Sequence, residues 1–272
     1  MDRLVSPSFS PATLATAFAV TPHLSHDRAV SHILTDSRSL LTPEETLFFA
    51  IRTESGDGHR YIESLYERGV RSFVVEQLSS ETEAKYSGCN WYVVTSSITA
   101  LQALARTHRE RFPLLHTIGI TGSNGKTVVK ELLYQLLSPC FHTMRSPRSY
   151  NSQIGVPLSV LSITATDEVA LIEAGISRPG EMAALEEVIV PQLGVFTSLG
   201  SAHQEGFASL EEKLEEKLRL FEHSSSLFYS LDTPLVAEAM RERFPTKSHY
   251  TWSHKDPAAT VYVRTTEATS TT

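Results

Sequence analysis

A glycine-rich segment between an apolar strand and a helix constrains the fold of this chain more than any other feature. Residues 118–127 read Ile-Gly-Ile-Thr-Gly-Ser-Asn-Gly-Lys-Thr, and Leu132, Leu133 and Leu136 follow at helical spacing. Glycines let the backbone curl so that several N–H groups face one anion, and the start of a helix adds a partial positive charge. The segment therefore predicts a strand, a phosphate-binding loop and a helix, in that order.

The residue types in this loop suggest individual roles. Lys126 is placed to reach the β- and γ-phosphates of a nucleotide, and the Thr127 hydroxyl is placed to ligate Mg²⁺. The strict pattern G-x-x-x-x-G-K-[ST] fails, because Ile120 occupies the first glycine position. A GTPase switch lacks support, because the sequence contains no Asn-Lys-x-Asp. We expect the nucleotide to contact Thr121, Gly122, Ser123, Asn124, Gly125, Lys126 and Thr127.

Strand-like and helix-like patterns alternate along the chain. Strands are expected at 46–51, 72–76, 91–95, 117–120, 170–173, 195–198, 227–230 and 261–263, and helices at 11–19, 61–68, 98–111, 126–137, 181–188 and 209–221. Alternation of this kind predicts an α/β fold with a parallel sheet and right-handed crossovers. Pro113 stops the helix before it, so we place a domain boundary there and expect domains at 1–112 and 113–272.

Composition excludes several classes of protein. Lys and Arg number 24 and Asp and Glu 31, so the net charge is 24 − 31 = −7, and no basic block is present to wrap nucleic acid. No apolar run approaches the ~18 residues of a membrane span. Cys89 and Cys140 are the only cysteines, too few for a disulfide framework or a Cys-rich zinc site. We therefore expect a cytoplasmic protein in a reducing compartment.

Lys217 lies on the apolar face of the helix expected at 209–221. At helical spacing, Leu210, Leu214 and Phe221 define the centre of an apolar stripe, and Lys217 falls inside it. One interpretation is a lysine that snorkels past a partly buried face. The other is a lysine with a dedicated partner, such as a carboxylate, a phosphate or a chemical change to its amine.

Two further residues are expected at the ligand-binding edge of the sheet. Glu173 ends strand 170–173 and His203 follows strand 195–198, so both reach the carboxyl edge, where ligands bind in such folds. Each has an ordinary alternative: a strand-end charge for Glu173 and a solvated loop side chain for His203. The other histidines show neither H-x-x-x-H nor H-x-H spacing, so we expect no zinc site.

Taken together, these residues resemble the Mur ligase family, the ATP-dependent amide ligases of peptidoglycan precursor synthesis. The family loop G-[IV]-T-G-T-N-G-K-T is matched by residues 119–127, with Ser123 in place of Thr. Three more family segments follow in order: N-x-x-I-G-x-P-L at 151–158, E-x-G…G-E-[IM] at 173–182, and H-x-E-x-F-x-S at 203–209 with Lys217 downstream. The resemblance spans about 33–230 and implies that Asn151 contacts ATP phosphate or substrate.

The N-terminal part resembles the segments that hold a UDP-sugar in these enzymes. The matching stretches are residues 35–38 and 56–59. The resemblance implies UDP-sugar contacts for Asp36, Ser37, Arg38, Asp57, Gly58 and His59. Arg38 can offer a bidentate fork to a phosphate, but a surface ion pair is an equally open interpretation.

The resemblance also implies a reaction and the residues that perform it. ATP phosphorylates a substrate carboxylate to an acyl phosphate, an amine attacks it, and phosphate leaves. Lys126 and the loop amides then serve phosphoryl transfer, which is mostly positioning and charge neutralisation. Thr127 and Glu173 would ligate one Mg²⁺, with Glu173 and His203 near a second. Lys217 would be carbamylated by CO₂ and so become an anion able to hold Mg²⁺. Lys126, His203 and Lys217 are the implied catalytic residues.

Within the family, residues 154–158 and 203–207 are most similar to the ligase that joins D-alanyl-D-alanine to UDP-N-acetylmuramoyl-tripeptide. Ile176 and Ser177 replace the usual Ala-Asn after E-x-G, which resembles forms of that enzyme fused to an alanine racemase. A fragment that binds nucleotide or UDP-sugar without turnover, or another Mur-type ligase, is the alternative. A small-molecule kinase is a weaker one, because it would not require Asp36, Ser37 and Arg38.

Family members have three domains. We expect this chain to contain the UDP-sugar domain and an incomplete ATPase domain, with the C-terminal domain of the same polypeptide missing. The Thr-rich stretch at 265–272 fits either a disordered tail or a chain cut inside a domain. Activity of the isolated chain is therefore doubtful.

Overall fold

The structure, a computed structural model, describes residues 7–54, 56–200 and 206–264. The chain divides into two compact units. The first contains Met1–Pro113 together with Val160–Ala165, and the second contains Leu114–Ser159 and Thr166–Thr272.

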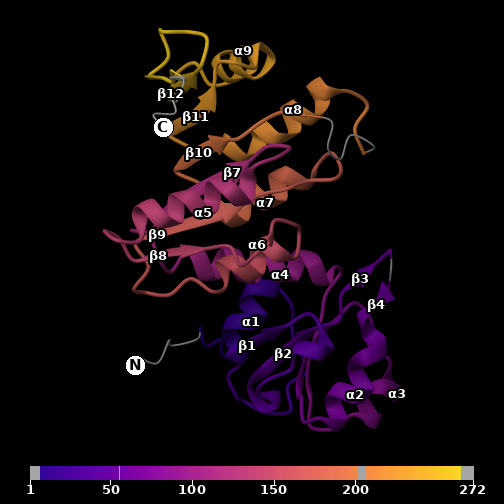
Figure 1. Cartoon of the computed structure of the whole chain (residues 1–272). Helices are drawn as coiled ribbons and strands as arrows, with labels where there is room; N and C mark the ends of the chain where they lie inside the picture. Colours follow the sequence, from indigo (N-terminus) through magenta and orange to yellow (C-terminus); the bar gives the residue numbers. More distant parts are fainter. Residues whose placement is uncertain (1–6, 55, 201–205, 265–272) are drawn as a thin grey trace, which may run out of the picture. The chain divides into compact units, whose positions relative to one another are not determined.

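The first unit is built on a parallel four-stranded sheet with the order β1-β2-β5-β6 (Figure 1). Its strands are β1 (His32–Leu34), β2 (Thr46–Phe49), β5 (Ser72–Val75) and β6 (Asn90–Val93), and a small antiparallel pair is formed by β3 (Arg52–Thr53) and β4 (Gly56–Asp57). The helices are α1 (Pro11–Phe18), α2 (Ile62–Glu67), α3 (Ser80–Lys85) and α4 (Ser97–Arg109).

Both faces of this sheet are buried, as is usual for parallel sheets with crossover helices. On one face Phe48 and Phe73 pack in a cluster with Leu65 of α2. On the other, Phe49 makes an edge-to-face contact with Phe18 of α1, with ring centroids 5.9 Å apart. The strands therefore read as continuous apolar runs rather than as alternating ones.

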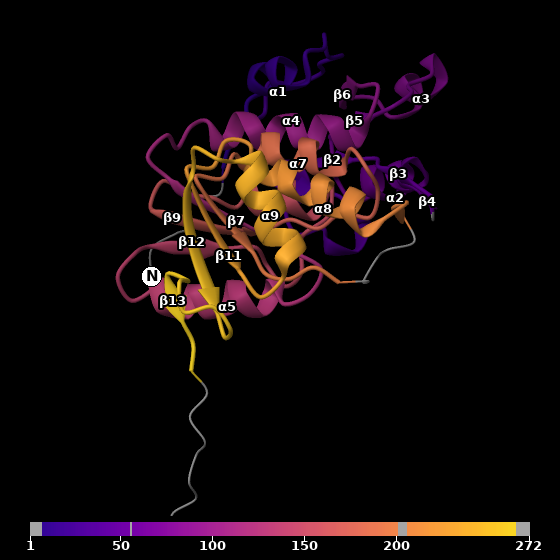
Figure 2. The same ribbon diagram turned by 90° about the horizontal axis from the view of Figure 1, so that it is seen from above.

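The second unit contains a seven-stranded sheet in which every strand pair is parallel, with the order β13-β12-β11-β10-β7-β9-β8. The strands are β7 (His116–Thr121), β8 (Thr143–Arg145), β9 (Val169–Glu173), β10 (Leu193–Phe196), β11 (Ser226–Ser230), β12 (Ser248–Ser253) and β13 (Val261–Tyr262). The helices are α5 (Lys126–Leu137), α6 (Gly155–Val160), α7 (Glu181–Ile189), α8 (Leu210–Leu218) and α9 (Pro234–Arg243). Figure 2 shows α5 on one face of the sheet and α7, α8 and α9 on the other.

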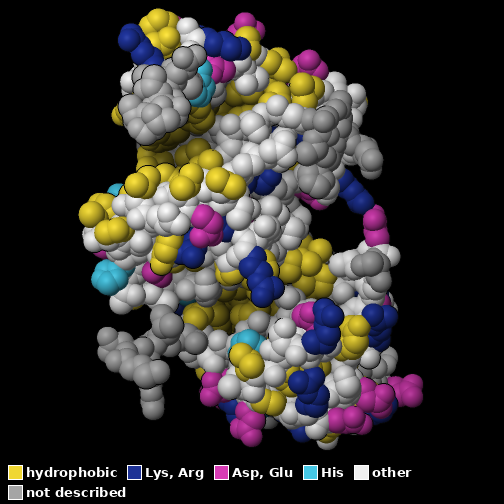
Figure 3. Space-filling model, viewed as in Figure 1, with side chains coloured by type: hydrophobic (Ala, Val, Ile, Leu, Met, Phe, Trp, Pro, Cys, Tyr) yellow, Lys and Arg dark blue, Asp and Glu magenta, His cyan; other side chains and the backbone are white. Residues whose placement is uncertain are grey.

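Helix α5 is apolar on two sides. Its inner side contributes Val129 and Leu133 to the core formed by β7, β9 and β10. Its outer side exposes Val128, Leu132 and Leu136, which are 63%, 54% and 72% accessible. Figure 3 shows the corresponding row of hydrophobic side chains over this helix. Spacing of four residues places these three side chains on one stripe.

The expected fold class is confirmed: a small parallel α/β sheet is followed by a larger parallel one. The strand expected at 195–198 lies two residues earlier, at Leu193–Phe196. Periodicity did not reveal this start, because Gly194 lacks a side chain and instead makes room for the Phe221 ring, which would lie 2.3 Å from an added Cβ. The polar Thr197 and Ser198 that follow do not continue the strand; they contact the phosphate loop.

Several elements carry too little pattern to be predicted. β8, β12 and α9 are absent from the expected set, and the helix expected at 209–221 ends at Leu218, with a 3-10 turn at Arg219–Phe221. β8 has only three half-buried residues, and the first four residues of β12 alternate between exposed and half-buried positions. Within the described residues, no helix is both long and apolar enough to cross a membrane.

Candidate phosphate-binding site

The glycine-rich segment forms a tight turn between β7 and α5. Gly122 has φ +142° and Gly125 has φ +83°, values that side-chain-bearing residues rarely adopt. A Cβ on Gly122 would lie 2.1 Å from Oγ1 of Thr197, so the loop passes directly against the end of β10. Helix α5 begins at Lys126, with its first N–H groups directed into the loop.

Residues that follow β10 hold this loop in place. The N–H of Ser123 donates to the carbonyl of Ser198 at 2.7 Å, and the N–H of Asn124 donates to the Ser198 hydroxyl at 3.2 Å. The Ser123 hydroxyl donates to the carbonyl of Gly200 at 3.0 Å. The Thr121 hydroxyl is buried and donates to the carbonyl of Ala174 at 2.9 Å, so it is occupied within the protein.

The structure brings together Thr127 and Glu173, the two oxygen-bearing side chains expected to hold a metal. Parallel pairing sets Glu173, the last residue of β9, beside Ile120 of β7. The Thr127 hydroxyl donates to Oε1 of Glu173 at 2.7 Å, and the Glu173 side chain is fully buried. Mg²⁺ prefers oxygen ligands and usually retains several waters with one or two protein groups and substrate phosphates. A hydroxyl and a carboxylate in contact therefore fit Mg²⁺.

No group of three or more His, Cys, Asp or Glu side chains that could hold a metal occurs among the described residues. His203, expected as a catalytic residue and metal ligand, lies outside them. A site assembled from the described residues alone thus relies on Thr127, Glu173 and phosphate oxygens rather than on a dedicated protein cage.

Three lysines converge on the carbonyls of this region. Nζ of Lys126 donates to the carbonyl of Gly122 at 2.9 Å, and Nζ of Lys217 donates to the same carbonyl at 3.3 Å. Nζ of Lys213, one helical turn before Lys217 on α8, donates to the carbonyl of Gly200 at 2.7 Å. Both α8 lysines are almost fully buried, at 1% and 2% exposure.

Burial lowers the pKa of all three amines, and neighbouring lysines lower the pKa of Lys126 and Lys217 further. Burial, followed by the charges of Lys126 and Lys213, lowers the pKa of Lys217 to about 7. Burial also lowers the pKa of Lys126, against the opposing effect of Glu173, and lowers the pKa of Lys213. Ammonium groups gathered in a dry site favour an anionic ligand between them.

Asn151 contacts Gly175, in the segment that follows β9. Its carbonyl accepts from the N–H of Gly175 at 2.8 Å, and its side chain would be 3.1 Å from a Cβ on that glycine. Asn151 therefore packs against the backbone two residues beyond Glu173, and its contact with a phosphate or a substrate stays a prediction.

In the first unit, Asp36 and Arg38 form a pair at a 3-10 turn, Ser37–Ser39. The Arg38 guanidinium donates to the Asp36 carboxylate through Nε at 2.9 Å and through NH2 at 2.6 Å. These hydrogen bonds lower the pKa of Asp36 to about 2. The Arg38 side chain is 87% exposed, so it retains donors that face solvent.

The second expected UDP-sugar segment is held by its own hydrogen bonds. Asp57 accepts from Nδ1 of His59 at 2.6 Å, and Nε2 of His59 accepts from the N–H of Glu76 at 3.0 Å, so both ring nitrogens are engaged. Gly58 has no room for a side chain, because a Cβ would lie 2.7 Å from the backbone nitrogen of Ile51. Across the described residues, no hydrogen bond or ion pair joins this segment to residues 36–38.

Sequence reasoning missed two lysines beside the phosphate loop. Lys130 is fully buried and lies 3.6 Å from Oε2 of Glu173; its spacing of three residues from Thr127 was the available signal. Lys213 repeats the position of Lys217 one turn earlier on α8. Both read as ordinary helix-surface lysines until the neighbouring elements are in place.

Comparison with known proteins agrees with this geometry. A model of the Mur ligase middle domain matches residues 120–272, more than half of the chain, so the chain belongs to the Mur ligase family.

Within this family, the chain is similar to UDP-N-acetylmuramoyl-tripeptide–D-alanyl-D-alanine ligases, the MurF enzymes. It is 30% identical to the enzyme of Bacillus subtilis over 235 residues, which are 85% of this chain and 50% of that protein. It is 33% identical to the enzyme of Treponema pallidum over 198 residues, 70% of this chain and 43% of that protein. The chain thus spans about half the length of these relatives.

Solved structures give the same picture. MurF from Acinetobacter baumannii superposes with a TM-score of 0.83 over 92% of this chain and 55% of its own; at 23% identity this is a likeness of fold. A MurF ligase from Thermotoga maritima, solved in complex with ADP, superposes with a TM-score of 0.72 at 27% identity, over 83% of this chain and 51% of its own.

Proposed function

We propose that this chain supplies the UDP-sugar-binding and ATP-binding parts of a ligase that adds D-alanyl-D-alanine to UDP-N-acetylmuramoyl-tripeptide. The observation that carries the proposal is the contact between Thr127 and Glu173 at 2.7 Å, at the start of a helix that follows a glycine-rich loop. The similarity to MurF enzymes supports the choice of substrates.

In this proposal the second unit binds ATP. The first N–H groups of α5 and the ammonium of Lys126 would neutralise the phosphates, and Lys126 would leave the loop carbonyls that it now contacts. Thr127 and Glu173 would hold Mg²⁺. When bound, the ion would supply positive charge that offsets the negative charge developing during transfer.

The proposed reaction has two steps. The carboxylate of the tripeptide attacks the γ-phosphorus of ATP, giving an acyl phosphate and ADP. The amine of D-alanyl-D-alanine then attacks the acyl carbon, the C–O bond breaks, and phosphate leaves with formation of the amide. The buried cationic surroundings of the loop would stabilise the anionic oxygens in both steps.

Lys217 would act as a carbamate. A neutral amine adds to CO₂ and releases one proton, which gives a carbamate anion able to hold Mg²⁺. The lowered pKa of Lys217, about 7, supports the availability of the neutral amine near neutral pH. His203 is proposed as a second metal contact on the resemblance alone.

The first unit would bind the UDP-sugar through the exposed donors of Arg38 and through the turn at Asp57, Gly58 and His59. These assignments, the domain division at residue 112 and the cytoplasmic location remain predictions. A polypeptide beyond this chain would supply the rest of the ligase, because the similar MurF enzymes are about twice as long as the matched region.

Binding of each ligand to the chain tests the proposal. Titration calorimetry should detect ADP binding that strengthens with Mg²⁺, and separate binding of UDP-N-acetylmuramoyl-tripeptide. Lys126→Met should weaken ADP binding by at least about ten-fold, because it removes a charge-assisted contact worth roughly 1.5–3 kcal/mol. Lys247→Met is the matched control: Lys247 also donates to backbone carbonyls, but at Phe221 and Ser224.

A phosphate-release assay with ATP, Mg²⁺, the tripeptide substrate and D-alanyl-D-alanine separates the alternatives. Binding of both ligands without phosphate release would indicate that this chain is a portion of a ligase and needs the remainder of the enzyme for turnover. Release that requires both substrates would make the 272 residues a ligase by themselves. Failure to bind ADP in the presence of Mg²⁺ would refute the proposal.

A further inference from the structure

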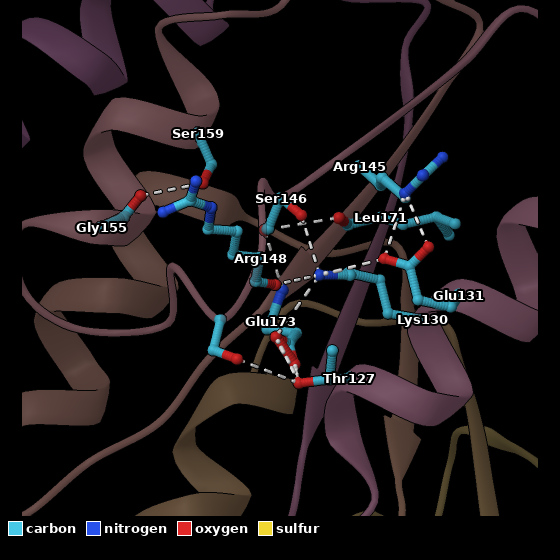
Figure 4. A network of polar contacts seen from close by, with 11 residues as sticks. Thr127, Lys130, Glu131, Arg145, Ser146, Arg148, Gly155, Ser159, Leu171 and Glu173 are labelled. Atoms are coloured by element: carbon cyan, nitrogen blue, oxygen red, sulfur yellow. Dashed lines mark hydrogen bonds and ion pairs between the residues drawn. The ribbon is translucent and has the colours of Figure 1, made fainter.

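Lys130 occupies the centre of a polar network beside the phosphate loop (Figure 4). It lies three residues beyond Thr127 on α5, so the two side chains share a face of the helix. The side chain is 0% exposed. Its ammonium donates to the carbonyl oxygen of Ser146 at 2.8 Å and to that of Arg148.

The same buried ammonium faces two carboxylates. Nζ of Lys130 lies 3.6 Å from Oε2 of Glu173 and 3.5 Å from Oε1 of Glu131. Glu131 is also held by Nε of Arg145, at 2.9 Å, whereas Glu173 is buried completely. A buried carboxylate without a cation nearby is strongly unfavourable, so Lys130 compensates the charge of Glu173.

The carbonyls that bind this ammonium belong to the connection after β8. Arg148 adopts φ +48°, a left-handed conformation that is costly for a residue with a side chain, and the hydrogen bond to its carbonyl stabilises it. The connection also reaches the metal-ligand candidates. The Ser146 hydroxyl accepts from the N–H of Glu173 at 3.2 Å, and the Ser149 hydroxyl lies 3.4 Å from that of Thr127.

We propose that Lys130 is a positioning residue for the nucleotide–Mg²⁺ site. It holds the Glu173 carboxylate beside the Thr127 hydroxyl and fixes the connection after β8 next to both. The inference rests on the proposed function, because it takes Glu173 as a metal ligand. Lys130 itself contacts neither nucleotide nor metal and acts through Glu173. Loss of such a supporting residue typically changes metal affinity by about 10–100-fold.

A positioning role and a purely electrostatic role of Lys130 predict opposite effects of its removal on Mg²⁺ affinity. A cation near a metal site repels Mg²⁺. If Lys130 influenced the site only through its charge, its removal would strengthen Mg²⁺ binding. If it holds the carboxylate in place, its removal weakens Mg²⁺ binding although a repulsive charge has gone. The direction of the change therefore distinguishes the two roles.

The test is the Mg²⁺ dependence of ADP binding, measured by titration calorimetry on the 272-residue chain. Lys130→Met has a similar length but lacks the charge and the donors. It should raise the Mg²⁺ concentration needed for half of the metal-dependent gain in affinity by at least about ten-fold. ADP affinity in the presence of a chelator should change by less than about two-fold, because the loop amides and Lys126 remain.

Two further variants make the result independent of folding defects. Lys130→Gln keeps hydrogen-bond donors for the carbonyls but lacks the charge; it should shift the Mg²⁺ requirement in the same direction, and it decides the question if Lys130→Met does not fold. Lys247→Met removes a lysine that also donates to backbone carbonyls, at Phe221 and Ser224. It should leave the Mg²⁺ requirement unchanged.

A double-mutant comparison checks that Lys130 acts through Glu173. In a Glu173→Gln background, Lys130→Met should cause no further change in the Mg²⁺ requirement. Unchanged or tighter Mg²⁺ binding in the folded Lys130 variants, or fully additive effects with Glu173→Gln, would overturn the inference. Absence of Mg²⁺-dependent ADP binding in the unaltered chain would instead refute the proposed function, and this inference with it.

Discussion

At the scale of single residues, the lysines around the phosphate loop differ in how their charge is compensated. Lys130 is buried beside the carboxylate of Glu173, at 3.6 Å. Lys217 is buried with a carbonyl oxygen at 3.3 Å, and the charges of two neighbouring lysines disfavour its protonated form. Lys130 thus faces a carboxylate, whereas burial and the two neighbouring lysines lower the pKa of Lys217 to about 7.

The pH dependence of Lys217 modification follows from this difference. CO₂ reacts with the neutral amine, which is the minor form well below the folded pKa of about 7 and the major form above it. At a fixed pressure of ¹³CO₂, a carbamate signal should therefore increase between about pH 6 and pH 8, measured by ¹³C NMR.

The matched control is Lys247→Arg, which should retain the signal, whereas Lys217→Arg should lose it. A signal that persists without Lys217, or one that falls as the pH rises, would contradict the assignment. Lys217 is the better candidate for this chemistry than Lys247, because the latter donates to three backbone carbonyls.

At the scale of elements, the turn between β7 and α5 depends on its glycines. Gly122 combines φ +142° with contact to the end of β10, whereas Gly180, at the start of α7, has φ +85° but nothing within 4 Å of an added Cβ. A side chain at either position would strain the backbone, but only at Gly122 would it also collide with a neighbouring residue.

Gly122→Ala should therefore damage the loop more than Gly180→Ala. A methyl group 2.1 Å from Oγ1 of Thr197 forces the loop to move, so ADP affinity should fall by at least about ten-fold and stability by roughly 1–3 kcal/mol. Titration calorimetry and urea unfolding measure the two effects. Gly180→Ala should keep ADP affinity and lose about 1 kcal/mol from strain alone. Equal ADP affinity in the two variants would show that the close approach of β10 is unimportant.

Elements also differ in how far the sequence predicts them. Helix α5 begins at Lys126 and ends at Leu137, as its pattern indicates, and Ser209 caps α8 by accepting from the N–H of Glu212 at 3.1 Å. The Glu212 carboxylate, however, accepts from the N–H of Ala208 rather than from that of the capping serine. Local hydrogen-bonding groups specify where a helix starts, but the partner of each depends on the path of the preceding loop.

At the scale of the whole molecule, the chain consists of two units with separate cores. The expected ligand contacts are divided between them: Arg38 and His59 belong to the first, and the phosphate loop belongs to the second. Each ligand should therefore stabilise its own unit most strongly.

Hydrogen exchange can measure this division. ADP with Mg²⁺ should slow amide exchange at residues 119–127 and in β9 by about ten-fold or more, with little change in β2 and β5. UDP-N-acetylmuramoyl-tripeptide should slow exchange near residues 36–39 and 57–61. Protection by ADP confined to the first unit would contradict the assignment of the nucleotide to the loop.

The sequence by itself determined the α/β class and the glycine-rich loop between a strand and a helix, because these depend on local periodicity and glycine conformation. The pairing of Thr127 with Glu173 was implied by the resemblance to the family, and the shared edge of parallel strands accounts for it. Only the tertiary structure revealed that Lys130 and Lys213 are buried, since a lysine on a helix is ordinary until another element removes it from water. The same holds for His59, whose two ring nitrogens are engaged by residues 2 and 17 positions away. Burial and charge compensation are properties of packed elements, so no single segment of the sequence specifies them.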